Sequence, residues 1–135
     1  MSRLLALDWG RKRIGVAISD PSGILASPYT TLDATPRKRL LERIKNIINE
    51  ENIECIIIGL PLNMDGSEGK SALQARSLAD EVESLGIPVK THDERLSSYE
   101  ANRLLRDAGK KPSRNKGLID RAAATLILQD FLDSK

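Results

Sequence analysis

The amino-acid sequence predicts an α/β protein in which helices cover a five-stranded mixed sheet. Two observations carry this prediction. The first 35 residues hold three strand-like segments joined by tight turns, and the rest alternates apolar segments of strand length with segments of helical periodicity. An antiparallel meander followed by β-α-β crossovers gives a sheet of mixed direction. We expect the 135 residues to form a single domain over residues 1–135.

The N-terminal segments are typical of a hairpin with two unlike faces. A mostly apolar strand is expected at Arg3–Asp8, and a tight turn leads into a second strand at Lys12–Ser19. In the second strand, branched residues alternate with Gly15 and Ala17, so one face is bulky and the other is small.

The third strand is expected near Leu25–Leu32, after a turn. Asp20-Pro21-Ser22-Gly23 has the residue order of a type I turn. Because Pro28 cannot donate a hydrogen bond to a neighbouring strand, this strand belongs at the edge of the sheet.

Helices and strands alternate in the remainder of the chain. Thr35 is expected to be the N-cap of a helix with Pro36 at its first position, and apolar residues from Leu40 to Ile48 follow one helical face. Glycines close two of the later helices. The other expected elements are strands at Ile53–Leu60 and Pro88–His92 and helices at Lys70–Leu85, Ser98–Ala108 and Leu118–Leu132.

Composition excludes several classes of function. One Cys and one His cannot build a Cys/His zinc site, and no apolar run has membrane-spanning length, so a cytoplasmic location is expected. Four aromatic residues are too few for the base-stacking platform of a single-strand binder. A nucleic-acid partner would therefore be held through its phosphates.

Acidic residues occur where the predicted strands end. Asp8 ends the first strand, Asp93 and Glu94 follow the last, and Asp120 flanks the apolar face of the final helix. Each has an ordinary structural explanation when taken alone. Carboxylates brought together at one edge, however, repel one another unless they are protonated or share a cation. Mg²⁺ or Mn²⁺ takes such ligands, and two such ions could activate water against a phosphodiester.

Basic residues are concentrated near these acids. The stretch Arg106–Arg121 contains six basic and two acidic residues, a net charge of +4, which leaves −2 for the rest of the chain. A flexible, solvated loop is the plain alternative, but its position before Asp120 favours phosphate binding. The candidate nucleic-acid contacts are Arg11, Lys12, Arg13, Arg95, Lys110, Lys111, Arg114 and Lys116.

Three other motifs are weaker candidates. The segment from Gly66 to Ser71 ends like a phosphate-binding loop, but Met64 stands where that motif requires Gly. Ser97 fits a capping box, which accounts for it without catalysis. His92 could act as a base, although a strand histidine near a carboxylate is more often structural.

Four segments together resemble the bacterial Holliday-junction-resolvase-like family, whose members are described as pre-16S rRNA nucleases. They are Leu7–Ala17, Gly59–Ser67, Asp93–Ser98 and Ile119–Ala124, and the resemblance spans nearly the whole chain. It implies an RNase H-like fold and a Mg²⁺- or Mn²⁺-dependent endonuclease that matures the 5′ end of 16S rRNA during ribosome biogenesis. The family's acidic ligands correspond to Asp8, Glu94 and Asp120, with Asp93 left open as the alternative to Glu94.

Other functions stay open at this point. A junction resolvase acting on branched DNA would be a homodimer, yet no dimer seam is visible, so monomer and homodimer are both possible. A noncatalytic RNA-binding assembly factor would need only the basic residues. Asp8-x-Gly10 also resembles the first phosphate loop of sugar kinases and actin, but those proteins close two domains around ATP, and this chain has room for one.

Overall fold

The sheet has five strands, as the sequence predicted, and their order is β3-β2-β1-β4-β5. The computed structural model describes residues 2–63, 65–93 and 116–134. β1 pairs antiparallel with β2 and parallel with β4, so the sheet is mixed. The elements are β1 (Arg3–Asp8), β2 (Arg13–Ser19), β3 (Ala26–Asp33), α1 (Arg37–Glu50), β4 (Ile53–Leu60), α2 (Lys70–Glu83), β5 (Val89–Asp93) and α4 (Lys116–Asp133).

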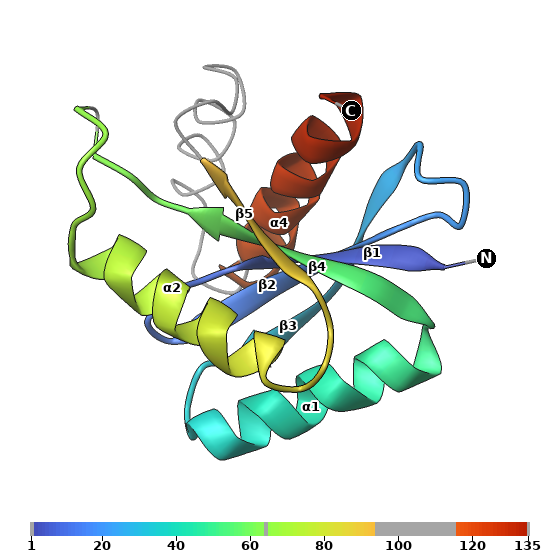
Figure 1. Cartoon of the computed structure of the whole chain (residues 1–135), viewed down its shortest axis with the longest axis horizontal. Coiled ribbons are helices and arrows are strands. Elements are labelled where there is room, and N and C mark those ends of the chain that lie inside the picture. Colours follow the sequence, from blue (N-terminus) through green and yellow to red (C-terminus); the bar gives the residue numbers. More distant parts are fainter. Residues whose placement is uncertain (1, 64, 94–115, 135) are drawn as a thin grey trace.

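Helices cover both faces of this sheet. Figure 1 shows α1 and α2 in front of the sheet and α4 behind it. The larger apolar cluster joins Leu5, Leu7 and Ile58 of the strands to α1 and α2, and the smaller one joins Ala6 and Ala17 to α4. The predicted helix at Ser98–Ala108 lies outside the described residues.

The edge position of the third strand is confirmed. β3 lies at one end of the sheet and pairs only with β2, where Pro28 stands opposite Ala17 beside a break in register. The turn before it also forms as predicted, since the Gly23 N–H donates to the Asp20 carbonyl at 3.0 Å.

The predicted start of the first helix was wrong by one residue. Pro36, not Thr35, occupies the N-cap, and α1 begins at Arg37. Pro36 has extended backbone angles, which mark a cap rather than a helical residue, and its carbonyl accepts from the Leu40 N–H at 3.2 Å. No side chain caps this helix, so Thr35 does not have the predicted role.

The small face of β2 determines how closely α4 approaches the sheet. A Cβ atom on Gly15 would lie 1.9 Å from the backbone carbonyl oxygen of Asp120, which is a steric clash. Only glycine, which has no Cβ atom, fits at this position. The first turns of α4 therefore rest directly on β2. None of the helices in the described part of the chain combines the length and apolar character needed to cross a membrane.

Candidate active site

Three parallel strands end side by side at one edge of the sheet. β1 runs parallel to β4, and β4 runs parallel to β5, so their carboxyl ends meet. Asp8 is the last residue of β1, and Asp93 is the last residue of β5, beside Leu60 of β4. The sequence placed its candidate carboxylates at this edge, and the strands bring these two there.

Strand alternation places Asp8 on the face covered by α4. Leu5 and Leu7 belong to the cluster under α1 and α2, whereas Leu4 and Ala6 belong to the cluster under α4. Asp8 continues the second series, because side chains on a strand alternate between faces. It is half-buried, and its neighbour in β2 is Gly15.

Asp120, which is carried by α4, lies on the same face of the sheet as Asp8. Its backbone lies over Gly15, the residue paired with Asp8, so both acids sit at one level of the sheet on one face. The helix follows the predicted pattern, with Ala124 and Leu128 buried against the strands in the turns after Asp120. Asp8 and Asp120 are thus 112 positions apart in sequence, but the close packing of α4 on Gly15 brings them together.

Arg13 is the partner of the Asp120 carboxylate. Its Nε donates to Oδ2 of Asp120 at 2.8 Å, and the two side chains are 33% and 24% exposed. Ion pairs of this kind fix the orientation of the carboxylate. The sequence assigned Arg13 to phosphate binding, and the structure instead pairs it with an acidic candidate.

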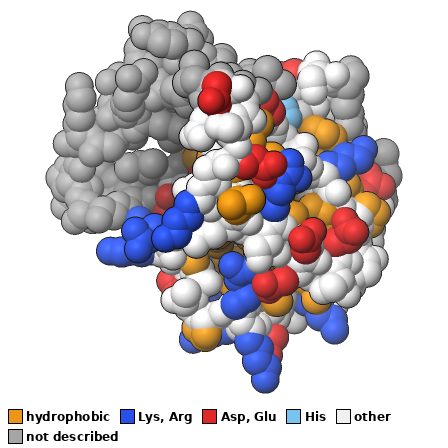
Figure 2. Space-filling model, turned by 60° about the vertical axis from the view of Figure 1, so that its left-hand side comes forward, with side chains coloured by type: hydrophobic (Ala, Val, Ile, Leu, Met, Phe, Trp, Pro, Cys, Tyr) orange, Lys and Arg blue, Asp and Glu red, His pale blue; other side chains and the backbone are white. Residues whose placement is uncertain are grey.

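An open groove of about 490 Å³ lies beside this ion pair. It is lined by Gly10, Arg11, Lys12, Arg13 and Asp120. Arg11 and Lys12 are exposed, so their charges face solvent at the end of the groove. Figure 2, viewed toward the left-hand side of Figure 1, shows Lys and Arg side chains projecting there with acidic side chains among them.

Asp93 lies on the opposite face from Asp8. Its partner in β4 is Leu60, which belongs to the cluster under α1 and α2. The preceding residue, His92, contacts α4 instead, so the alternation of β5 gives the two residues different faces. This geometry disfavours Asp93 as a companion of Asp8. Glu94, the other candidate, lies outside the described residues.

His92 has a structural environment. Its Nε2 lies 2.6 Å from Oδ2 of Asp130, and its ring meets the edge of Phe131 with the ring centroids 6.3 Å apart. Lys90 also stands over the Phe131 ring, 5.8 Å from its centroid. These contacts tie β5 to the C-terminal half of α4, which supports the structural interpretation of His92 over the catalytic one.

The two described carboxylates fit a hard divalent cation. Mg²⁺ is commonly held by one or two carboxylates together with waters and substrate phosphates. Asp8 and Asp120 supply that donor set on one face, and Arg13 occupies only Oδ2 of Asp120. Among the described residues, no three His, Cys, Asp or Glu side chains are grouped closely enough to hold a metal ion.

The remaining predicted phosphate contacts are not described in this structure. Arg95, Lys110, Lys111 and Arg114 lie outside the described residues, and Lys116 is the first residue of α4. Sequence reasoning counted Arg121 in the basic stretch but did not place it among the candidate nucleic-acid contacts. Arg121 donates to Oγ1 of Thr31 on the edge strand at 3.1 Å, one residue after Asp120, and only its position in that motif could have singled it out.

The loop before α2 forms its own compact turn. The Ser67 N–H donates to Oδ1 of Asp65 at 2.9 Å, and the Asn63 N–H donates to the Ser67 carbonyl. Gly69 is the N-cap of α2. The polar groups of this loop therefore bond to one another, as in an ordinary surface loop between a strand and a helix.

The chain matches one known family over nearly all of its length. A family model described as "RuvX: Holliday junction resolvase" matches residues 2–134. A protein of Roseiflexus sp. named "Putative pre-16S rRNA nuclease" is 45% identical over 134 residues, which covers 98% of this chain and 95% of the relative. A protein of Thermoanaerobacter pseudethanolicus with the same name is 44% identical over 135 residues, with 98% and 97% covered.

Solved structures share the fold. Thermus thermophilus RuvC in complex with a Holliday junction substrate aligns with a TM-score of 0.59 at 13% identity, covering 99% of this chain and 96% of the other. The yeast mitochondrial Holliday junction resolvase aligns with a TM-score of 0.60 at 14% identity, covering 97% and 78%. The expected RNase H-like resolvase fold is confirmed by these alignments and by the sheet order. The chain therefore belongs to the RuvX family and is a nuclease, a hydrolase of phosphodiester bonds, built on the fold of the junction resolvases.

Proposed function

We propose that this protein is a metal-dependent endonuclease that cuts structured RNA, with the 5′ end of pre-16S rRNA as its substrate. The relatives' shared name supports the choice of RNA. The observation that carries the chemistry is the seating of α4 on Gly15, which brings Asp120 onto the face and level of Asp8. Glu94 is proposed as a third ligand, because strand alternation disfavours Asp93.

The carboxylates would hold one or two Mg²⁺ or Mn²⁺ ions. Bound there, such ions supply an activated water and stabilise the leaving oxygen of the phosphodiester. Arg13 keeps the Asp120 carboxylate in one orientation through Oδ2 and leaves Oδ1 for a cation. The exposed side chains of Arg11 and Lys12 bind phosphates on either side of the scissile bond, which positions the strand in the groove.

The basic segment before α4 supplies the rest of the proposed phosphate contacts. Arg95, Lys110, Lys111, Arg114 and Lys116 stay predictions in this role. So do the cytoplasmic location and the choice between monomer and homodimer. Because contacts of this kind are electrostatic, RNA affinity should fall steeply with salt.

The test compares the wild type with Asp8→Asn on two substrates. A precursor 16S rRNA fragment and a four-way DNA junction are incubated with Mg²⁺, with Mn²⁺ and with EDTA, and the products are separated on gels. Asp80→Asn is the matched control, because Asp80 is exposed on α2 at the other face of the sheet. We expect metal-dependent cleavage of the rRNA by the wild type and the control, and loss of cleavage by Asp8→Asn.

The family model's own description favours a second candidate, cleavage of branched DNA. Cutting of the junction alone would establish that candidate in place of the first. If Asp8→Asn cuts the rRNA as well as the wild type does, the metal-site proposal is wrong.

A further inference from the structure

We propose that RNA extending from the cleavage site runs along a second surface, over the end of β3 and onto α1, where Arg39 and Arg43 bind its phosphates. This proposal rests on the proposed function for the location of the scissile bond. The two arginines are not among the candidate ligands. We call the whole path the α1 track, and it consists of the groove at Asp120 and two neighbouring depressions.

The depressions are adjacent, because each shares a lining residue with the next. The groove at Asp120 and the next depression, of about 370 Å³, share Arg11. That second depression, which Trp9, Ala34, Arg37, Gln74 and Glu81 also line, shares Thr35 with a third, smaller pocket. A hydrogen bond from the Ala34 N–H to the Lys12 carbonyl, 2.9 Å long, joins a lining residue of the second depression to a lining residue of the groove.

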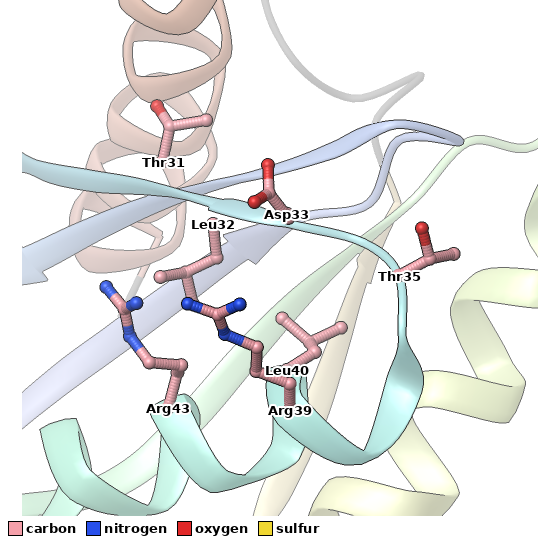
Figure 3. Close-up of a pocket in the computed structure, with 7 residues that line it drawn as sticks. All are labelled: Thr31, Leu32, Asp33, Thr35, Arg39, Leu40 and Arg43. Carbon is pink, nitrogen blue, oxygen red and sulfur yellow. The ribbon is translucent and has the colours of Figure 1, made fainter.

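The third depression is a small basic pocket between β3 and α1. Figure 3 shows Arg39 and Arg43 rising from α1 toward the strand, with Leu32 between them, Leu40 beside Arg39 and Thr35 at the far end. Arg39 and Arg43 are one helical turn apart, so their Cβ atoms are about 5–6 Å from each other and both can reach one phosphate or two adjacent ones. The pocket volume of about 60 Å³ is too small for a nucleotide cofactor, whose sites are of order 300 Å³ or more.

The charges along the track favour an extended polyanion. Two of its acids are already neutralised, since Asp120 pairs with Arg13 and Glu81 pairs with Arg37 at 3.1 Å. Within the part of the chain that the structure describes, Arg39 and Arg43 make no ion pair and are exposed, as Arg11 and Lys12 are. The one remaining acid along the track is Asp33, so these four basic side chains face one carboxylate, an excess of three positive charges.

A nucleic-acid backbone fits these features better than a base-reading contact does. The track is lined by one aromatic residue, Trp9, so successive bases have no stacking platform. Arginine side chains and the hydroxyl of Thr35 are groups that commonly contact phosphates. The occupant is therefore the sugar-phosphate backbone of the RNA strand that leaves the cleavage site.

The test measures binding without metal, so that it does not depend on catalysis. The probes are a fluorescent RNA hairpin with a long single-stranded extension and the same hairpin without it, titrated in EDTA at several salt concentrations. The variant is Arg39→Ala/Arg43→Ala. Its matched control is Lys38→Ala/Lys45→Ala, which removes the same charge from exposed positions on another side of α1.

We expect the arginine variant to bind the extended RNA about tenfold more weakly, with a salt slope shallower by about 1.4, because single-strand phosphate contacts contribute about 0.7 each. The bare hairpin and the lysine control should change less than about twofold. Equal losses in both variants, equal losses on both RNAs, or no gain in wild-type affinity from the extension would overturn the α1 track.

Cleavage is measured separately with Mg²⁺ on the bare hairpin. The arginine variant should cut it as fast as the wild type, because Arg39 and Arg43 are remote from the carboxylates. If the wild type binds the extended RNA as expected but cuts neither RNA, the proposed function fails while the α1 track stands.

Discussion

Arg13 and Asp120, which are 107 positions apart, form a 2.8 Å ion pair at the mouth of the candidate active site. Arg13 is the first residue of β2, and Asp120 lies in the early turns of α4. The pair therefore ties the helix to the meander at the level of Asp8. Asp120 is also a proposed metal ligand. The ion pair therefore orients a carboxylate that would bind the cation as well.

The first prediction concerns Arg13→Ala. Both side chains are partly exposed, so water screens the pair, and its loss should lower the free energy of unfolding by no more than about 1 kcal/mol. RNA cleavage should fall by a much larger factor, about tenfold or more, mainly in kcat, because the Asp120 carboxylate loses its fixed orientation. Urea unfolding and single-turnover cleavage measure the two effects.

The control for Arg13→Ala is Arg76→Ala, which removes another exposed ion pair, that of Arg76 with Glu68. It should leave cleavage unchanged. An Arg13→Ala enzyme that cuts normally, or whose defect is entirely in KM, would show that Arg13 binds phosphate rather than positioning Asp120.

The second prediction concerns Gly15→Ala. The new methyl group would stand 1.9 Å from the Asp120 carbonyl oxygen, so α4 must move away from β2. Overpacking of this kind costs about 1–3 kcal/mol. We expect a lower melting temperature together with lost cleavage, because the displaced helix carries Asp120 away from Asp8.

Gly69→Ala is the matched glycine control. The nearest atoms to a Cβ there belong to the Asn63 side chain at 3.6 Å, an ordinary contact, and Gly69 has φ of −85°. This variant should fold and cut like the wild type. Full activity in Gly15→Ala would show that the close approach of α4 is not needed for the site.

The sequence predicted the features of the site that depend on local patterns, and it missed those that depend on contacts between distant segments. The spacing of Asp120 to the apolar residues after it placed this acid beside the buried face of its helix, and Gly15 and Ala17 marked a small face on β2. Both are local patterns. The pairing of Arg13 with Asp120 depends on how α4 is set against the sheet, which no local pattern contains.

The fold was predicted more completely than the site, for the same reason. Hydrophobic periodicity and turn residues identified the described strands, and the proline in β3 placed that strand at the edge. The N-cap at Pro36 was missed by one residue because Thr35-Pro36 fits two capping registers equally well. Arg39 and Arg43 were missed because exposed arginines on a helix have no distinctive sequence pattern.

The third prediction separates structure from catalysis at His92. His92→Asn removes the 2.6 Å contact with Asp130 and the edge contact with Phe131, and it should destabilise the protein by about 1–3 kcal/mol. Cleavage per folded molecule should not change. Asp130→Asn and the double variant complete a thermodynamic cycle, in which a coupling energy near zero, or a selective loss of kcat in His92→Asn, would contradict the structural role.

The fourth prediction uses the turn between β2 and β3. The Ser22 hydroxyl and the N–H groups of Leu25 and Ile24 donate to the Asp20 carboxylate, and they lower its pKa from 3.8 to about 2. Because the folded state has the lower pKa, this carboxylate stabilises the fold fully above about pH 4, and the contribution disappears as the pH falls toward 2.

Thermal melts of the wild type and Asp20→Asn across this range test the sign. The wild type should melt higher at neutral pH, and the difference should hold down to about pH 4 and then shrink. Ser22→Ala removes the largest cause of the lowered Asp20 pKa. The difference in melting temperature between Ser22→Ala and the wild type should therefore change with pH in the same way, with a smaller amplitude. A difference between wild type and Asp20→Asn that is unchanged near pH 2 would mean that the charged carboxylate does not hold this turn.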